Sequence, residues 1–133
     1  MLATANQSQA IRLRLPKLHL AQRATSDEAA RFNVLVAGRR FGKNVLFRDI
    51  AIHPALHGHP VGWFAPSYRM LTDDYREMKA LLSPLVTQAN EAQKTLRLIT
   101  GGVIDFWSLA NPDSPRGRKY KTVIINEAGY VKV

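Results

Sequence analysis

Short β-branched or aromatic runs alternate with segments of helical periodicity along this chain, and this order constrains the fold more than any other feature. The strand-like runs are 33–37, 61–66 and 123–125, and helical patterns cover 43–53 and 67–85. The runs are nearly all apolar, which is typical of strands buried on both faces of a parallel sheet. The sequence therefore predicts an α/β domain with a mostly parallel sheet.

Local signals give the expected ends of several elements. Thr25 or Ser26 is a plausible N-cap for a short helix, and Ser67 for the next long one. In that long helix Asp73 and Asp74 belong to the solvated face, and the inward face is formed by Leu71, Tyr75, Met78, Leu82 and Leu85. Two β-rich runs around Gly101-Gly102 predict a hairpin over 95–108. Residues 1–10 are expected to lack regular structure.

Composition excludes some classes of protein and favours one kind of partner. The chain has 133 residues, enough for one domain or part of one, and no cysteine, which excludes disulfides and thiolate metal sites. It has no membrane-spanning apolar run and no secretory signal, so a cytoplasmic setting fits. The net charge of +9 favours a polyanion, nucleic acid above all. The alternative is a basic protein whose charge serves solubility alone.

A loop with the character of a phosphate-binding turn separates the first strand-like run from the first helix. Its residues are Ala37, Gly38, Arg39, Arg40, Phe41, Gly42, Lys43 and Asn44. The pattern G-x-x-x-x-G-K-[ST] has glycine where this chain has Ala37 and a hydroxyl where it has Asn44. Backbone amides and the helix N-terminus would hold the phosphates, and Lys43 would reach the terminal ones. The alternative is a solvated basic turn.

The segment VIINEA, 123–128, has the form of a Walker B strand, in which an apolar run ends in metal-side and catalytic residues. Glu127 would orient or deprotonate the attacking water. Asn126 stands at the metal-side position, where it could act only weakly and through water. The alternative for Glu127 is a solvated carboxylate at a strand end.

Taken in order, NVLVAGRRFGKN, GWFAPSY, LITGGVIDFWSL, RGRKYK and VIINEA resemble the ATPase segments of phage terminase large subunits over residues 16–130. The resemblance implies a P-loop NTPase of the RecA/ASCE-like type, a three-layer sandwich that is incomplete here. It implies an N-terminal extension over 1–15 and a partial ATPase domain over 16–133, without the C-terminal nuclease domain. It implies ATP and Mg²⁺ as cofactors.

The same resemblance assigns roles and partners. Gln22 matches an adenine-reading glutamine, Arg39 or Arg40 matches the basic residues of the Walker A loop, and Arg116 matches an arginine that reaches a γ-phosphate. With Lys43 and Glu127, Arg116 completes the implied catalytic set. The implied partners are double-stranded DNA, the terminase small subunit, the portal protein of the procapsid and further copies of the chain, in the host cytoplasm.

Two metal-side positions depart from the family pattern together, since Asn44 replaces a hydroxyl and Asn126 replaces an aspartate. An amide oxygen carries no charge, so Mg²⁺ binding is expected to be weak and the isolated chain a weak or inactive ATPase. The chain is expected to be a fragment or a decayed prophage product. The alternatives are a non-catalytic nucleic-acid-binding prophage remnant and a helicase-like ATPase.

Two further sets of residues carry weaker signals. Zinc binding is a minor alternative for the histidines His19, His53, His57 and His59, because they lack supporting carboxylates. The aromatic residues Trp63, Phe64, Phe106 and Trp107 are expected to lie in the core and not to stack on bases.

Overall fold

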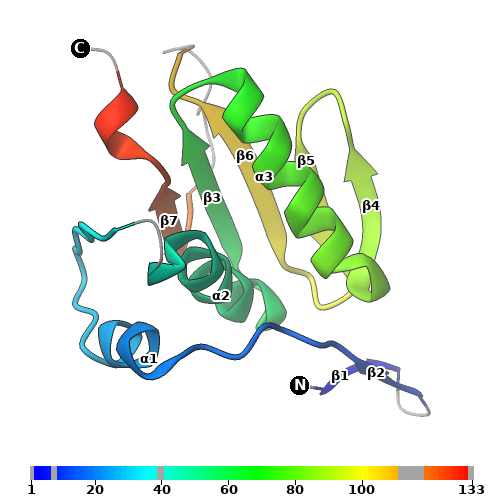
Figure 1. The fold of residues 1–133 in the computed structure, drawn as a ribbon. Helices are drawn as coiled ribbons and strands as arrows, with labels where there is room; N and C mark the ends of the chain where they lie inside the picture. The colour runs from blue at the N-terminus through cyan, green and yellow to red at the C-terminus, as the bar shows by residue number, and fades with distance from the viewer. Residues whose placement is uncertain (1, 7–8, 39–40, 111–118, 132–133) are drawn as a thin grey trace.

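The computed structural model describes residues 2–6, 9–38, 41–110 and 119–131. Within these ranges a five-stranded sheet carries three helices (Figure 1). The helices are α1 (Leu20–Asp27), α2 (Lys43–Leu56) and α3 (Tyr68–Leu81). The sheet strands are β3 (Pro60–Ala65), β4 (Val86–Asn90), β5 (Thr95–Leu98), β6 (Val103–Ser108) and β7 (Thr122–Ile125). Short 3-10 turns cover Ser83–Leu85 and Ala128–Tyr130.

The sheet is mixed, with strand order β4-β5-β6-β3-β7. Strand β3 pairs in parallel with β6 and β7, so that Trp63 lies opposite both Phe106 and Ile124. The pairings β4–β5 and β5–β6 are antiparallel. The α/β class is therefore confirmed, whereas the expectation of a mostly parallel sheet is corrected. The sequence did not reveal β4, and together with the confirmed β5–β6 hairpin this strand makes half the sheet antiparallel.

The hairpin depends on two glycines that close it against α2. Gly101 has φ +90°, a conformation that L side chains rarely adopt. A Cβ on Gly102 would lie 2.0 Å from the carbonyl oxygen of Ala55, at the end of α2. Only glycine permits this approach, which places the start of β6 directly under the helix.

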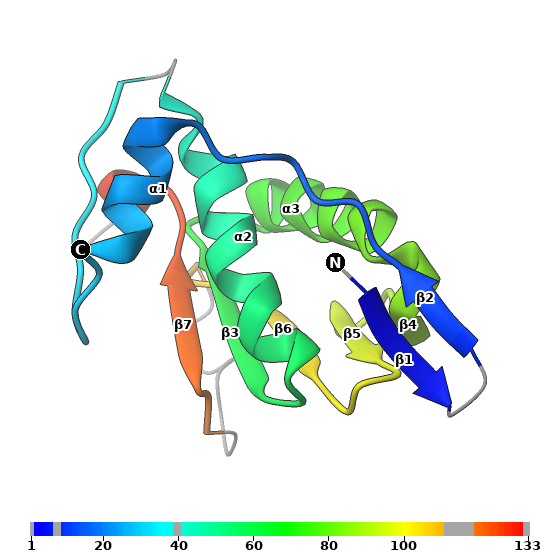
Figure 2. The same cartoon turned by 90° about the horizontal axis from the view of Figure 1, so that it is seen from below.

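Helices α2 and α3 cover one face of the sheet, as the view from below shows (Figure 2). Helix α3 follows its sequence pattern: Ser67 Oγ accepts the Met70 N–H at 3.2 Å, and Leu71, Tyr75 and Met78 are buried. Burying side chains of this size contributes roughly 1.5–3 kcal/mol each. Because the described helices lie on one face only, the described part of the chain has two layers and not three.

The aromatic residues divide between the two faces of the sheet. Trp63 and Phe106 are buried in the core beneath the helices, as expected. Phe64 lies on the opposite face against the ring of Tyr120, with centroids 6.3 Å apart. The Nε1 of Trp107 donates to the Tyr120 hydroxyl at 2.7 Å. Trp63, Phe64 and Phe106 are thus buried, whereas Trp107 is only half-buried and lies outside the core.

The N-terminal part differs from the expectation in two ways. Strands β1 (Leu2–Asn6) and β2 (Gln9–Arg12) form an antiparallel hairpin where no regular structure was expected, and Leu13 after it is buried in the core. Helix α1 begins at Leu20, so the N-cap predicted at Thr25 or Ser26 is wrong, and both residues lie in the last turns.

The buried strand predicted for 33–37 is also wrong. In the described part of the chain this segment pairs with no strand, and Val34 and Val36 are each 93% exposed. Asn33 fixes a local turn instead, because its side chain accepts the Ala30 N–H at 2.8 Å and donates to the Ala30 carbonyl at 2.7 Å. The segment is the extended coil from α1 toward the start of α2 in Figure 1, and β7 is left as an edge strand.

No helix in the described ranges is both long enough and apolar enough to cross a membrane.

Candidate functional site

The loop before α2 is built around Gly42, which is the N-cap of the helix. Gly42 has φ +76° and ψ +44°, and no side chain caps the helix at this position. A Cβ on Gly42 would lie 2.5 Å from Gln22 Nε2. Glycine is therefore required both for the backbone conformation and for the approach of α1. The first amides of α2 have no partners within the helix, and the helix dipole favours an anion beside them.

Helix α1 holds this loop from one side. The side-chain amide of Gln22 donates to the Phe41 carbonyl at 3.0 Å and to the Gly42 carbonyl at 2.8 Å. His19 Nδ1 accepts the Gln22 N–H, which leaves His19 Nε2 as the donor to the Phe41 carbonyl at 2.8 Å. The loop carbonyls are thereby fastened to α1.

This arrangement bears on the implied role of Gln22 as an adenine reader. Gln22 is only 3% exposed, and its Oε1 accepts the His19 N–H at 2.9 Å in a reciprocal capping box. The side chain lies against the phosphate-loop residues, but its donors and its acceptor are all in use. Contact with a base would require Gln22 to give up bonds that shape the loop.

Lys43 and Glu127, which are far apart in the sequence, meet at the end of the sheet. Lys43 Nζ lies 3.1 Å from Glu127 Oε1, and the two side chains are 25% and 32% exposed. A pair this exposed contributes about 0–1 kcal/mol. Glu127 adopts φ +55°, which is unfavourable for a residue with a side chain. The two predicted ends of a nucleotide site are thus in contact.

Asn126 is buried at the end of β7. Its backbone N–H donates to the Phe64 carbonyl at 2.8 Å, and its Nδ2 donates to Asp74 Oδ2 at 3.3 Å. Asn126 Oδ1 is buried and has no hydrogen-bond partner among the described residues. A buried acceptor normally has a donor. Its orphan oxygen fits a donor such as a cation-bound water, which is the weak role predicted for this residue.

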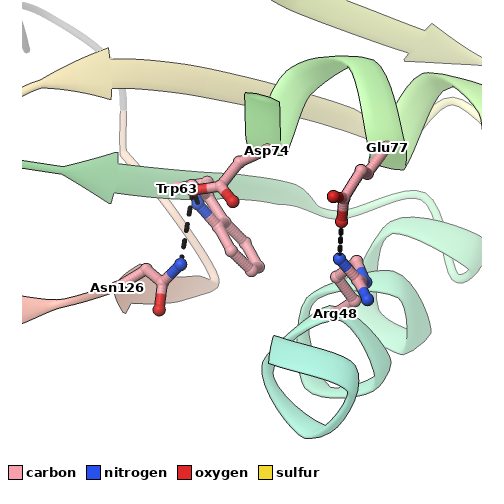
Figure 3. A network of polar contacts seen from close by, with 5 residues as sticks. All are labelled: Arg48, Trp63, Asp74, Glu77 and Asn126. Carbon is pink, nitrogen blue, oxygen red and sulfur yellow. Dashed lines mark hydrogen bonds and ion pairs between the residues drawn. The ribbon is translucent and has the colours of Figure 1, made fainter. Parts of the chain in front are cut away.

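Asp74 is the residue of this site that sequence reasoning missed, since it was assigned to the solvated face of α3. It is half-buried, and its Oδ2 accepts from Trp63 Nε1 at 2.9 Å as well as from Asn126 (Figure 3). Burial raises the pKa of Asp74 above its usual 3.8, and the hydrogen bonds from Trp63 and Asn126 oppose that rise. The sequence feature that could have indicated its partial burial is its position beside Tyr75, at the edge of the apolar stripe.

An ion pair beside this network ties the two long helices together. Arg48 on α2 binds Glu77 on α3 (Figure 3). Of these two residues, Glu77 raises the pKa of Asp74 and Arg48 lowers it, although both effects are smaller than that of burial. The charges around Asp74 therefore come from both helices.

The remaining predicted residues are dispersed or lie outside the described ranges. Asn44 is exposed in the first turn of α2, whereas Asn126 is buried. Phe41 N–H donates to the Gly38 carbonyl at 3.1 Å, and Ala37 is half-buried. The arginines assigned to phosphate charge, Arg39, Arg40 and Arg116, lie outside the described residues. No group of three or more His, Cys, Asp or Glu side chains in the described ranges could hold a metal ion.

Comparison with protein families, with curated proteins and with solved structures gave no match.

Proposed function

We propose that this chain binds ATP at the start of α2 and is the ATP-binding part of a DNA-packaging motor of the terminase large-subunit type. One observation carries the proposal: Lys43 Nζ and Glu127 Oε1 lie 3.1 Å apart. They come from the N-terminus of a helix and from the carboxyl end of a parallel strand. Ligands of open α/β sheets bind outside the carboxyl ends of their strands.

The ion pair gives each residue a defined part in binding. A polyphosphate carries more charge than one carboxylate, so it would compete with Glu127 for Lys43. The first amides of α2 add donors and the positive end of a dipole. Glu127, once released, could orient a water for attack on the terminal phosphate. Mg²⁺ bound with the nucleotide would neutralise phosphate charge.

Turnover by this chain is expected to be slow or absent. A nucleotide-bound cation is held best by a hydroxyl at the first of two positions and by a carboxylate at the second. This chain has the uncharged amides of Asn44 and Asn126 at these positions. A Mg²⁺-dependent rate on the order of 1 s⁻¹, within the usual range of enzymes, would contradict this part of the proposal.

The partners follow from the resemblance and from charge. The net charge of +9 suits contact with double-stranded DNA. The terminase small subunit, the portal protein, further copies of the chain and a host-cytoplasmic setting belong to the same proposal.

The test is nucleotide affinity by calorimetry, with EDTA present so that no cation contributes. Lys43→Ala should weaken ATP binding at least tenfold. Lys79→Ala is the matched control, because Lys79 lies on α3 and the substitution removes the same charge from its exposed pair with Glu91. Equal losses in both variants would refute a localised phosphate site. Salt-sensitive DNA binding without any ATP binding would instead favour the non-catalytic nucleic-acid-binding alternative.

A further inference from the structure

The carboxylate that position 126 lacks is present on a neighbouring helix. Position 126 carries an uncharged amide, but Asp74 reaches from α3 to within 3.3 Å of it. The two side chains form a hydrogen-bonded pair with one carboxylate and one amide (Figure 3). An acidic group therefore lies beside position 126, although a different element supplies it.

Asp74 also determines which way the Asn126 amide points. A carboxylate accepts from Nδ2 and repels Oδ1, so the amide is fixed with its nitrogen toward Asp74. Figure 3 shows Asn126 Oδ1 directed away from Asp74. Asn126 is 3% exposed, and the described residues supply this oxygen with no donor. A fixed and buried acceptor is thus left available at the end of the strand.

One oxygen of Asp74 is similarly available. The Trp63 and Asn126 hydrogen bonds both go to Asp74 Oδ2. No donor to Oδ1 is found among the described residues. Carboxylate and amide oxygens are ligands that hard divalent cations take, either directly or through their waters. Glu127, the next residue after Asn126, adds a further carboxylate that is paired with Lys43.

We propose that Asp74 and Asn126 act as one split metal-side group: Asp74 supplies the charge, and Asn126 Oδ1 accepts from a water on a divalent cation. The cation would be of the Mg²⁺ class and would be shared with the polyphosphate, so this inference rests on the proposed function. Asp74 is also a positioning residue, because it orients the Asn126 amide. A contact of the fold alone would make the same hydrogen bonds but would not respond to a cation.

The test exchanges the two side chains. Mn²⁺ binding to the full chain is measured by electron paramagnetic resonance, first without nucleotide and then with ATP. Asp74→Asn should weaken Mn²⁺ binding at least tenfold. The double variant Asp74→Asn/Asn126→Asp restores one carboxylate and should bind within about threefold of the wild type. Asn126→Asp alone gives two adjacent carboxylates and should bind Mn²⁺ more tightly.

The outcomes separate this inference from the proposed function. Absence of Mn²⁺ binding to the wild type under both conditions, or unchanged binding in Asp74→Asn, would overturn the inference. If Asp74→Asn does not fold, Asn126→Asp decides, and no gain in Mn²⁺ affinity would also overturn it. Nucleotide affinity in EDTA and its loss in Lys43→Ala test the proposed function alone. A chain that binds Mn²⁺ as expected but no ATP would retain the cation site and lose the nucleotide proposal.

Discussion

Replacing Gly42 by alanine is the sharpest test of the loop geometry. Two costs arise at once. The backbone at φ +76° disfavours a side chain by roughly 1–2 kcal/mol, and the new Cβ would meet Gln22 Nε2 at 2.5 Å. Gln22 is buried, so moving it away breaks its hydrogen bonds to the Phe41 and Gly42 carbonyls, each worth about 1 kcal/mol.

Alanine also lowers the conformational entropy of the unfolded chain, which stabilises the folded state by about 0.4–1 kcal/mol. The free energy of unfolding should therefore fall by about 2–3 kcal/mol in Gly42→Ala. Urea denaturation followed by the fluorescence of Trp63, which is buried, and of Trp107 measures it. Gly38→Ala is the control in the same loop, because a Cβ there meets nothing within 4 Å and φ is not positive. It should change stability by no more than about 0.5 kcal/mol.

A double-mutant cycle isolates the steric part. In a Gln22→Ala background there is no side-chain amide to displace, so Gly42→Ala should cost only the backbone term, about 1 kcal/mol. The coupling between the two positions should then be about 1–2 kcal/mol. Equal costs in both backgrounds would refute the contact with Gln22. A Gly42→Ala variant as stable as Gly38→Ala would refute the positive-φ cap as well.

Three further outcomes follow from the same contacts. Burial raises the folded-state pKa of Asp74 above its unfolded value. Its contribution to the free energy of unfolding is therefore present below pH 3.8 and lost as the pH rises through the folded-state pKa. Asp74→Asn should remove this loss, so the urea midpoint of the variant should exceed that of the wild type at pH 7 but not at pH 3. Lys43→Ala and Glu127→Gln should each lower the free energy of unfolding by no more than about 1 kcal/mol, because the pair is partly exposed, and a larger loss would show a structural ion pair. Gly102→Ala should cost at least about 3 kcal/mol in thermal or urea unfolding, since its Cβ meets backbone at 2.0 Å, whereas Gly129→Ala, with open space around it, should be nearly neutral.

The elements that the sequence predicted are those in which local pattern and tertiary environment agree. Helix α3 has its serine cap and its apolar stripe, and both are used as expected. The start of α1 was missed because histidine is not among the preferred N-caps, and its reciprocal bonds with Gln22 become visible only in three dimensions. The run at 33–37 has high β propensity, but propensity does not show whether another strand is available to pair with it. Without such a partner the segment does not form a strand.

The geometry of the candidate site could be predicted only in part, for similar reasons. Motif spacing placed Lys43 and Glu127 at a helix start and a strand end, and the fold brings them together. Asp74 could not be recognised, because its partners Trp63 and Asn126 come from two different strands. Helical periodicity predicts the burial of a residue only from its position on its own helix, and Asp74 lies at the border of the apolar stripe. Its environment is set by the sheet beneath it.

The end of β7 concentrates unfavourable features that the rest of the described chain mostly avoids. Only Lys94 and Glu127 are non-glycine residues with positive φ in the described ranges, and Lys94 lies in the turn between β4 and β5, where such a conformation closes a hairpin. Glu127 follows a parallel strand and closes no hairpin, and it stands directly after the buried unpaired oxygen of Asn126. Backbone strain costs about 1–3 kcal/mol and persists where the surrounding structure enforces it. Here the enforcing contacts come from three elements: the Phe64 carbonyl, Asp74 and Lys43 hold the strand end. A ligand that supplied the missing donor would satisfy the unpaired oxygen without moving any of these three groups.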